Sequence, residues 1–433
     1  MVVSPRLARF RFAVIARRER TLPAVIACAL ACVFAATTAP AATAPRFPRA
    51  PTAAAFTAKT HGLDKRAGLL TTHLDSKGAR LLLELPAPSG PRGECGSYLH
   101  LEGIRTGLGS NAVGLDRGQS GAAGVVTFRR VGARVFLEQQ NLRYRARSAD
   151  SNEVRAVRES FATSVLWAGE IQAESPDGRL LVDFTPFLVR DAHGAAATLK
   201  AAGQGSYSLD KDRSALDPQE CPSFPDNLEF EAVLTVAGDE PGPEVRATAP
   251  APRAVTIIQH QSLVRLPDAG YRPREWDPRS GSFDVLFADY ASPIGADFDV
   301  RWLVRHRLEK IDPSAARSRV KKPIVYYVDS GAPEPIRSAL IEGASWWAKA
   351  FEAAGFIDAF QVRLLPPGAD PLDVRYNVIQ WVHRATRGWS YGGGVIDPRT
   401  GEMLKGQVTL GSLRIRQDRL IFEGLAGTDK TGT

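Results

Sequence analysis

The chain has 433 residues, a formal net charge of +8 at pH 7 and 44% hydrophobic residues. A chain of this length exceeds a single compact core, and its composition is that of a globular protein, which argues against a wholly disordered one. The positive charge does not indicate a nucleic-acid partner, because six arginines stand against one glutamate in residues 1–44 and the remaining charge is spread without a basic face. We therefore expect a leader followed by two domains, and no nucleic acid as a partner.

The leader has the three parts of a secretory signal peptide. The N-terminal arginines precede an apolar run, Leu22–Ala35, and small residues follow up to Ala44. This pattern predicts a signal peptide over residues 1–44, too short for a membrane span, and therefore an exported protein of the periplasm or the extracellular space. An uncleaved N-terminal anchor is an alternative, as is lipid modification at Cys28 or Cys32. No later segment is apolar enough to cross a bilayer, so we expect no membrane span after signal cleavage.

A flexible lead-in rich in Ala, Pro and Thr is expected over residues 45–60, and a β-rich domain over residues 61–310. In this domain, short runs of β-branched and aromatic residues alternate with Gly, Pro, Asp and Asn, which is typical of strands joined by turns. The two runs on either side of Gly132 predict a hairpin that turns at this glycine. In Val154–Ala168, by contrast, the apolar residues have helical spacing. The strand candidates are Leu81–Leu85, Val125–Arg129, Val135–Gln139, Leu180–Phe184, Leu228–Val236, Val255–His260 and Ser262–Leu266.

Two cysteines remain once the leader is removed, Cys95 and Cys221. In an oxidising compartment two cysteines can form one disulfide, and we predict that bridge here. Two unpaired buried thiols are the alternative. Two cysteines alone do not make a structural zinc site.

The C-terminal part begins with a charged linker over residues 311–322, after Val304–Glu309, which has the pattern of a helix end. An apolar strand is expected at Ile324–Val328, followed by a helix that ends at Gly355. A glycine-rich strand and a turn at residues 397–401 join the last two of three further strands. These strands are Gln361–Leu365, Asn377–His383 and Gln407–Leu410, and the apolar face of the helix consists of Ile336, Leu340, Ala344, Trp347, Phe351 and Ala354.

The seven histidines are scattered, and none is followed by Glu. A zinc-binding helix of the HExxH type needs two imidazoles four residues apart with a Glu beside the first, so the sequence predicts no metal ligands and no catalytic residues. A zinc site assembled from scattered histidines is the alternative. Ser390 lies in a G-x-S-x-G pattern, Gly388–Gly392, but a nucleophile elbow needs a helix after the serine and a histidine later in the chain, and neither is expected.

One long block, Lys322–Asp418, and several shorter stretches carry a family resemblance. The shorter stretches are Gly107–Gln119, Asn141–Ala146, Ser164–Gly169, Arg190–Gly194, Asp277–Gly281 and Arg305–Lys310. On these residues the chain resembles secreted bacterial zinc-dependent metallopeptidases of the metzincin-like, HExxH type. In that family a β-rich domain of unknown function precedes the catalytic domain. The resemblance extends from about residue 60 to about residue 425.

The resemblance implies an α+β fold class, in which the β-rich domain, residues 61–310, is followed by the strand-helix-strands first half of a metzincin-like zincin domain over residues 323–425. In the family, the zinc-binding helix comes after the part that corresponds to Ser412–Leu425, whereas this sequence continues with a polar tail, residues 426–433. We therefore expect the N-terminal portion of a secreted zinc-dependent metallopeptidase, truncated before the catalytic motif and inactive alone. Zinc is then the cofactor of the full-length family, with no cofactor in this chain.

The resemblance also implies a peptide or protein substrate as the partner of the full-length family, held along an edge strand by main-chain pairing. The candidate strand is Gly406–Leu410, with Gly406, Val408, Thr409 and Leu410 as substrate-binding residues. An interior strand is the alternative for this segment. A free-standing β-rich envelope module that binds a glycan or a protein partner is the alternative function. The sequence leaves the oligomeric state open.

Overall fold

The computed structural model describes residues 53–427 of the chain. The signal peptide expected over residues 1–44, residues 45–52 of the lead-in and residues 428–433 of the polar tail lie outside the described residues. The described residues belong to one compact unit. Within them, no helix is both long and apolar enough to pass through a membrane.

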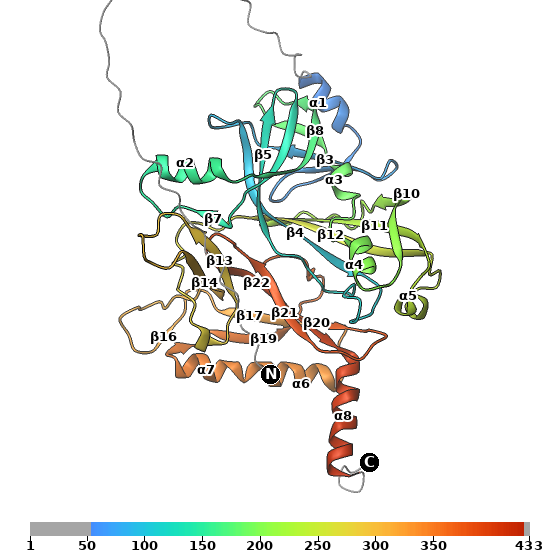
Figure 1. Cartoon of the computed structure of the whole chain (residues 1–433), viewed down its shortest axis with the longest axis vertical. Coiled ribbons are helices and arrows are strands. Elements are labelled where there is room, and N and C mark those ends of the chain that lie inside the picture. The colour runs from blue at the N-terminus through green and yellow to red at the C-terminus, as the bar shows by residue number, and fades with distance from the viewer. Residues whose placement is uncertain (1–52, 428–433) are drawn as a thin grey trace, which may run out of the picture. The chain divides into compact units, whose positions relative to one another are not determined.

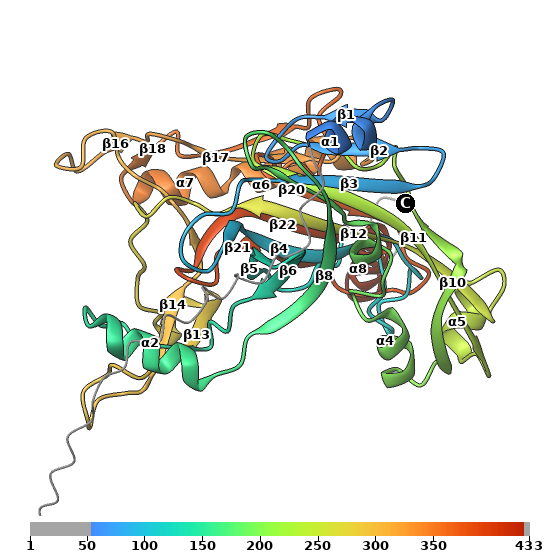
Figure 2. The same ribbon diagram turned by 90° about the horizontal axis from the view of Figure 1, so that it is seen from above.

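An antiparallel sheet of eleven strands is the largest element of the structure (Figures 1 and 2). Its spatial order is β1-β2-β3-β9-β8-β6-β5-β4-β12-β11-β10. A sheet of this width twists and curls, which allows it to enclose a core on one face. The strands are β1 (Asp64–Arg66), β2 (Thr72–Asp75), β3 (Arg80–Leu85), β4 (Glu94–Thr106), β5 (Gly124–Val131), β6 (Arg134–Gln139), β8 (Ser164–Glu174), β9 (Leu180–Asp183), β10 (Ser206–Leu216), β11 (Asn227–Asp239) and β12 (Ala254–Arg265).

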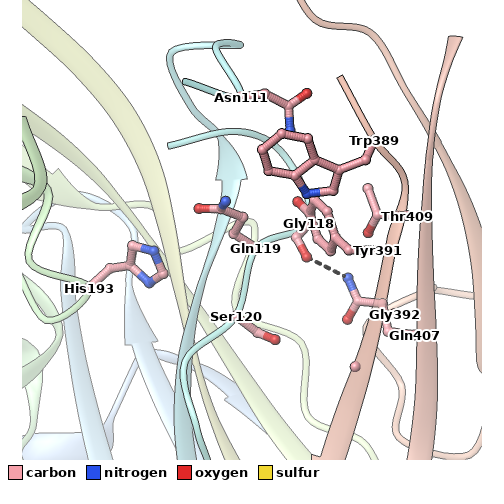
Figure 3. A pocket seen from close by; sticks show the side chains of 11 residues that line it. Asn111, Gly118, Gln119, Ser120, His193, Trp389, Tyr391, Gly392, Gln407 and Thr409 are labelled. Carbon is pink, nitrogen blue, oxygen red and sulfur yellow. Dashed lines mark hydrogen bonds between the residues drawn. The ribbon is translucent and has the colours of Figure 1, made fainter. Parts of the chain in front are cut away.

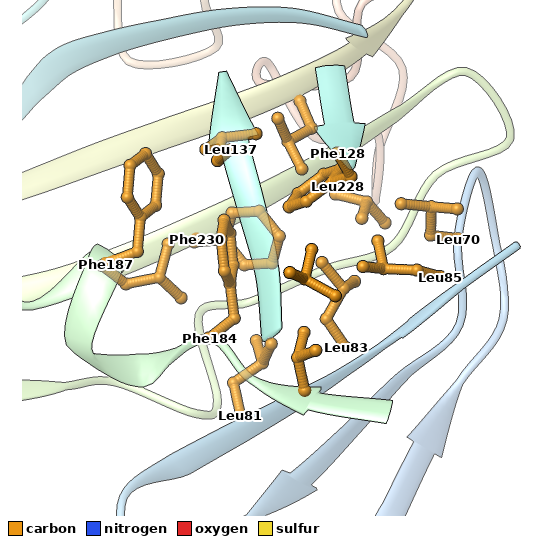
Figure 4. Packing of buried hydrophobic residues seen from close by; sticks show 14 of the residues in the cluster. Leu70, Leu81, Leu83, Leu85, Phe128, Leu137, Phe184, Phe187, Leu228 and Phe230 are labelled. Atoms are coloured by element: carbon orange, nitrogen blue, oxygen red, sulfur yellow. The ribbon is translucent and has the colours of Figure 1, made fainter. Parts of the chain in front are cut away.

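The main hydrophobic core lies on one face of this sheet (Figure 4). Strand β3 shows how alternation places side chains on the two faces. Leu81 and Leu83 belong to the main core, whereas Leu82 packs on the other side, near Phe56 of helix α1 (Ala53–Thr60). The centre of the core is aromatic, with Phe184 against Phe128, Phe187, Phe230 and Trp167.

Short helices pack against the large sheet. Leu199 of α4 and Val245 of α5 belong to a second buried cluster with Leu234 of β11. Each helix is too short to be stable in isolation, so tertiary packing holds it. These helices are α1 (Ala53–Thr60), α3 (Thr185–Leu188), α4 (Ala195–Ala201) and α5 (Pro243–Thr248).

Two smaller sheets lie beside the large one. The order of the three-stranded sheet is β14-β13-β7, and the two-stranded sheet pairs β16 with β18. In the large sheet, the hairpin expected to turn at Gly132 is confirmed, because Val131 at the end of β5 pairs with Arg134 at the start of β6. The elements are β7 (Tyr144–Arg145), α2 (Ser151–Ser160), the 3-10 helix η1 (Pro278–Ser280), β13 (Asp284–Asp289), β14 (Asp299–Leu303), β16 (Ser318–Arg319) and β18 (Phe356–Ile357).

A six-stranded mixed sheet completes the structure, in the order β15-β22-β20-β17-β19, with β21 paired to β22. All its pairings are parallel except that of β21 with β22. Helix α6 covers one face, where Leu340 and Ile341 pack against the cluster that contains Trp381. The elements are β15 (Arg305–His306), β17 (Ile324–Val328), α6 (Ile336–Ser345), α7 (Trp347–Ala353), β19 (Phe360–Leu364), β20 (Asn377–Val382), β21 (Tyr391–Ile396), β22 (Glu402–Gly411) and α8 (Ser412–Ala426).

The predicted α+β fold class is wrong. The structure is mostly β, with 40% strand and 18% helix, and no metzincin-like half-domain is present in it. The strands expected within residues 323–425 do form, and the single helix expected there forms as two, α6 and α7, divided at Trp346, but all of them pack into the same unit as the β-rich part. Arg145 Nη1, for example, donates to Arg399 O, and Val374 N donates to Asn227 Oδ1. Local periodicity identifies an element but not the surface against which it packs, so it could not reveal this union.

Four local expectations also need correction. The helix expected at Val154–Ala168 ends at Ser160, and the segment continues as β8, because pairing with β6 and β9 outweighs helical spacing. Residues 304–309 contain the short strand β15 rather than a helix end. The linker over residues 311–322 is ordered by the pairing of β16 with β18. Helix α1 occupies the second half of the expected lead-in.

Cys95 and Cys221 are both free thiols, so the expected disulfide is not formed. Both side chains are buried in the main core of the large sheet. Burial raises the pKa of the Cys221 thiol to about 12, and it raises that of Cys95 as well. The two cysteines therefore act as small core residues with unreactive thiols.

Candidate functional site

Strand β21 has one paired edge and one free edge. It pairs with β22 from Tyr391, opposite Thr409, to Ile396, opposite Met403. Within residues 53–427, no other strand pairs with β21. Its middle residues, Gly392 and Gly393, are exposed. The N–H and C=O groups on the free edge are therefore open to solvent or to another chain.

The glycines of β21 differ in whether their surroundings leave room for a side chain. A Cβ at Gly394 would lie 2.0 Å from Lys405 O, so packing against β22 demands glycine there. A Cβ at Gly393 would meet nothing within 4 Å, so packing does not require glycine at this position. A strand interior without side chains is typical of places where a ligand or another backbone approaches closely.

A pocket of about 370 Å³ lies beside β21, and we call it the Trp389 pocket (Figure 3). One wall comes from the segment that follows β4, a second from β21 and β22, and a third from His193, just before α4. Trp389 is 62% exposed. The lining residues are Asn111, Gly118, Gln119, Ser120, His193, Trp389, Tyr391, Gly392, Gly393, Gln407 and Thr409.

Hydrogen bonds fix the segment after β4 against the six-stranded sheet. Gln407 Nε2 donates to Gly118 O at 3.1 Å, the contact drawn in Figure 3. Gly118 has a φ of +91°, and a Cβ there would lie 2.6 Å from Gln380 Oε1 and 2.9 Å from Thr409 Oγ1. Both the left-handed backbone and the close approach therefore require glycine at position 118.

A buried ion pair lies beneath the pocket. Arg384 Nε contacts Asp116 Oδ2, and their side chains are only 3% and 1% exposed. Tyr391 Oη donates to the same carboxylate oxygen at 3.3 Å. Burial raises the pKa of Tyr391 to about 12, so its hydroxyl keeps its proton. Asp116 thus joins the first residue of β21 to the segment after β4.

The pocket itself carries no formal charge. Its lining side chains are amides, hydroxyls, aromatic rings and one imidazole. Burial lowers the pKa of His193, against the opposing effect of Asp191, so this imidazole is neutral at pH 7. Asn111 Oδ1 and His193 Nδ1 have no hydrogen-bond partner among the described residues. A buried polar atom without a partner costs about 1–3 kcal/mol, and a ligand group that hydrogen-bonds it removes this cost.

The substrate-binding residues expected from the sequence all lie on β22, which is an interior strand. Val408 pairs with Ile379 of β20 on one side and with Gly392 of β21 on the other. The main chain of Gly406, Thr409 and Leu410 likewise belongs to this interior strand, whereas the neighbouring β21 has an edge that is unpaired within the described residues. Thr409 lines the Trp389 pocket with its side chain.

Other parts of the site carry weak sequence signals or none. The run of glycines after Tyr391 is visible in the sequence as a glycine-rich strand, but the sequence does not show that this strand is the free one. Asn111 and Gln119 are more than 260 residues from Trp389 in the chain. Only the tertiary structure brings these residues together.

The described residues do not fit a zinc ion. No group of three or more His, Cys, Asp or Glu side chains within residues 53–427 could hold a metal. Four of the seven histidines have separate partners: His73 contacts Glu84, His100 contacts Gln261, His306 contacts Tyr326 and His383 contacts Ser412. Ser390 Oγ accepts from Gly411 N at 3.4 Å and precedes a strand, which is not the elbow geometry. We derive no chemical step from these residues.

Comparison with known proteins gives one match. Residues 118–311 are similar to the family described as Domain of unknown function (DUF5117). The matched part contains Gly118, Gln119, Ser120 and His193 of the pocket but neither β21 nor β22. No curated protein and no solved structure matches the chain.

Proposed function

We propose that the chain binds an extended peptide by strand addition along the free edge of β21. This is the substrate-binding role that the resemblance to secreted zinc-dependent metallopeptidases implies. The observation that carries the proposal is the unpaired edge of Tyr391–Ile396 within the described residues, exposed at Gly392 and Gly393. Such an edge offers alternating donors and acceptors that an extended chain satisfies with its own main chain.

The length of β21 sets the size of the ligand. Six residues at roughly 3.3 Å each give an edge of about 20 Å, which matches a peptide of five to seven residues. The register shift between Val395 and Ile396 is an irregularity that ends the flat part of the strand. The flat part therefore begins at Tyr391, beside the Trp389 pocket.

The surroundings of the edge also favour a peptide. Natural proteins protect an unused edge with a charged side chain, a proline or a covering loop. Positions 391–395 of β21 contain neither a charge nor a proline. The exposed glycines leave room for an incoming backbone, because no side chain stands between it and the strand.

Peptide backbone methylation tests the proposal most cleanly, because it leaves the protein unchanged. The probe is the fluorescein-labelled heptapeptide acetyl-Val-Lys-Val-Gln-Val-Lys-Val-amide, and its affinity is measured by fluorescence polarisation. Neighbouring N–H groups of a strand point to opposite edges. Methylating alternate amide nitrogens in one register should therefore weaken binding at least tenfold, and methylating the other register should leave it within twofold. Equal affinity for both methylated peptides and the parent would contradict strand addition.

Proline substitutions test the same contact from the protein side. The N–H groups of Gly392 and Gly393 point to opposite edges, so only one of them faces the ligand. One of the variants Gly392→Pro and Gly393→Pro should keep its melting temperature and lose peptide binding. The other should lose stability, because it removes a hydrogen bond to β22. Two stable variants that both bind the heptapeptide would contradict the proposal.

A further inference from the structure

We propose that the Trp389 pocket selects a neutral side chain that both donates and accepts hydrogen bonds, an amide above all, from the peptide bound along β21. This inference rests on the proposed function, since it concerns a side chain of the same ligand. It adds a specificity that the free edge alone does not provide, because main-chain pairing is independent of sequence.

The position of the pocket relative to β21 decides which part of a peptide can enter it. Tyr391 and Gly393 are two residues apart, so they lie on the same face of the strand, and both line the pocket. On an added strand, the residue directly opposite Gly393 projects its side chain to the same face, about 5 Å away. That side chain enters the pocket, whereas its two neighbours project to the opposite face.

The volume of the pocket suits a side chain. About 370 Å³ lies at the small end of the range of roughly 300–1,000 Å³ found for ligand pockets. Gly393 contributes no side chain toward it, and a Cβ there would meet nothing within 4 Å. The entrance from the strand edge is therefore open.

The absence of formal charge in the lining excludes ionised side chains as good occupants. The charges of Asp116 and Arg384, next to the lining residue Tyr391, are paired with each other. A carboxylate or ammonium group in the pocket would lose hydration without gaining a counter-charge. An incoming glutamate or lysine is thus disfavoured, although each has nearly the length of glutamine.

The polar groups of the lining also disfavour a purely apolar occupant. Asn111, Gln119 and Ser120 offer both donors and acceptors, and Asn111 Oδ1 has no partner among the described residues. A leucine would cover these groups without replacing their hydrogen bonds to water. An amide supplies an N–H and a C=O together, and its flat face can lie against the ring of Trp389, which lines the pocket together with Asn111 (Figure 3).

The test compares four heptapeptides that differ only at the central residue of the host given above: Gln, Glu, Lys and Leu. Full-length chain should bind the Gln peptide about tenfold more tightly than the Glu and Lys peptides, and at least threefold more tightly than the Leu peptide. Trp389→Ala should remove most of this preference. Trp346→Ala is the matched control, because Trp346 is similarly exposed, at 65% against 62%, and does not line the pocket. The control should keep the full preference.

The outcomes separate the two proposals. Equal binding of all four peptides would overturn the pocket's specificity and leave strand addition intact. An equal loss of preference in Trp389→Ala and Trp346→Ala would also overturn it. Binding of none of the peptides would overturn strand addition itself. If, in addition, chitohexaose quenched the tryptophan fluorescence in the unmodified chain but not in Trp389→Ala, the pocket would belong to a neutral glycan, which contradicts both proposals.

Discussion

The eleven-stranded sheet and the six-stranded sheet bury their side chains to very different extents. The large sheet encloses an aromatic core in which Phe128 and Phe184 are fully buried. Helices α6 and α7 on the six-stranded sheet contain no fully buried residue, and Trp346 and Trp347 are about two-thirds exposed. An apolar groove of about 550 Å³ remains between these helices and the sheet. The large sheet thus holds a fully buried aromatic core, whereas the helices on the six-stranded sheet leave apolar side chains exposed.

This contrast explains where binding is expected. Free edges and exposed apolar groups destabilise an isolated protein, so a well-packed neighbour has to support the element that bears them. The buried contact of Asp116 with Arg384 provides such support, because it joins the segment after β4 to the end of β20. The candidate site lies at this junction of the two sheets.

Removing one aromatic ring from each sheet should give the largest difference between the two sheets in the free energy of unfolding. Phe184→Ala empties the centre of the main core and should lower the free energy of unfolding by about 3–5 kcal/mol. Phe360→Ala in β19 should lower it by only about 1–2 kcal/mol, because Phe360 is half-buried. Urea denaturation of both variants measures these values. Equal losses would show that the two sheets are packed to the same degree.

Breaking the buried ion pair should have the next largest effect. Arg384→Met leaves Asp116 buried with only the Tyr391 hydroxyl as a polar partner and should lower the free energy of unfolding by at least about 3 kcal/mol. The matched surface variant Arg155→Met removes an exposed pair with Glu159 and should cost about 1 kcal/mol or less.

Adding Asp116→Asn to Arg384→Met should restore part of the lost stability, since no charge is then left buried without a partner. The same urea denaturation experiment measures the double variant. A double variant that is less stable than Arg384→Met would contradict this explanation of the pair.

Acid should destabilise both sheets through one buried histidine in each. Burial lowers the pKa of His100 in the large sheet and of His306 in the six-stranded sheet to about 4. In the unfolded chain both titrate near 6.5, so the stability that their neutral forms provide is complete above about pH 6.5 and falls as the pH drops toward 4. The stability difference between the unmodified chain and His100→Gln, or His306→Gln, should shrink over this range. A stability difference that stays constant between pH 7 and pH 4 would contradict the lowered pKa values of the two histidines.

Sequence patterns identified many elements of both sheets, because these elements depend on local periodicity. The strand at Ile324–Val328 and the hairpin at Gly132 are confirmed. Val154–Ala168 was predicted as one helix, but its second half became β8, since pairing with two neighbouring strands overrides a weak helical pattern. The α+β fold class was wrong for a related reason. Nothing local indicates that Val374 hydrogen-bonds Asn227, which is 147 residues earlier in the chain.

The candidate site was less accessible from the sequence than the strands were. The strand after Trp389 could be recognised as glycine-rich, but its neighbours decide that it, and not Gly406–Leu410, has the free edge. The pocket wall at Asn111 and Gln119 belongs to a segment with only a general loop pattern. Sites formed between distant segments depend on tertiary contacts, which periodicity does not encode.

Hydrogen exchange of the chain with and without the heptapeptide acetyl-Val-Lys-Val-Gln-Val-Lys-Val-amide tests strand addition most directly. The amides of Tyr391–Ile396 that face the free edge have no strand partner among the described residues and should exchange at least tenfold more slowly when the peptide is bound. The amides of β19, at the far edge of the same sheet, should be unchanged. Bound peptide with unaltered exchange along β21, or with protection of β19 instead, would contradict the account.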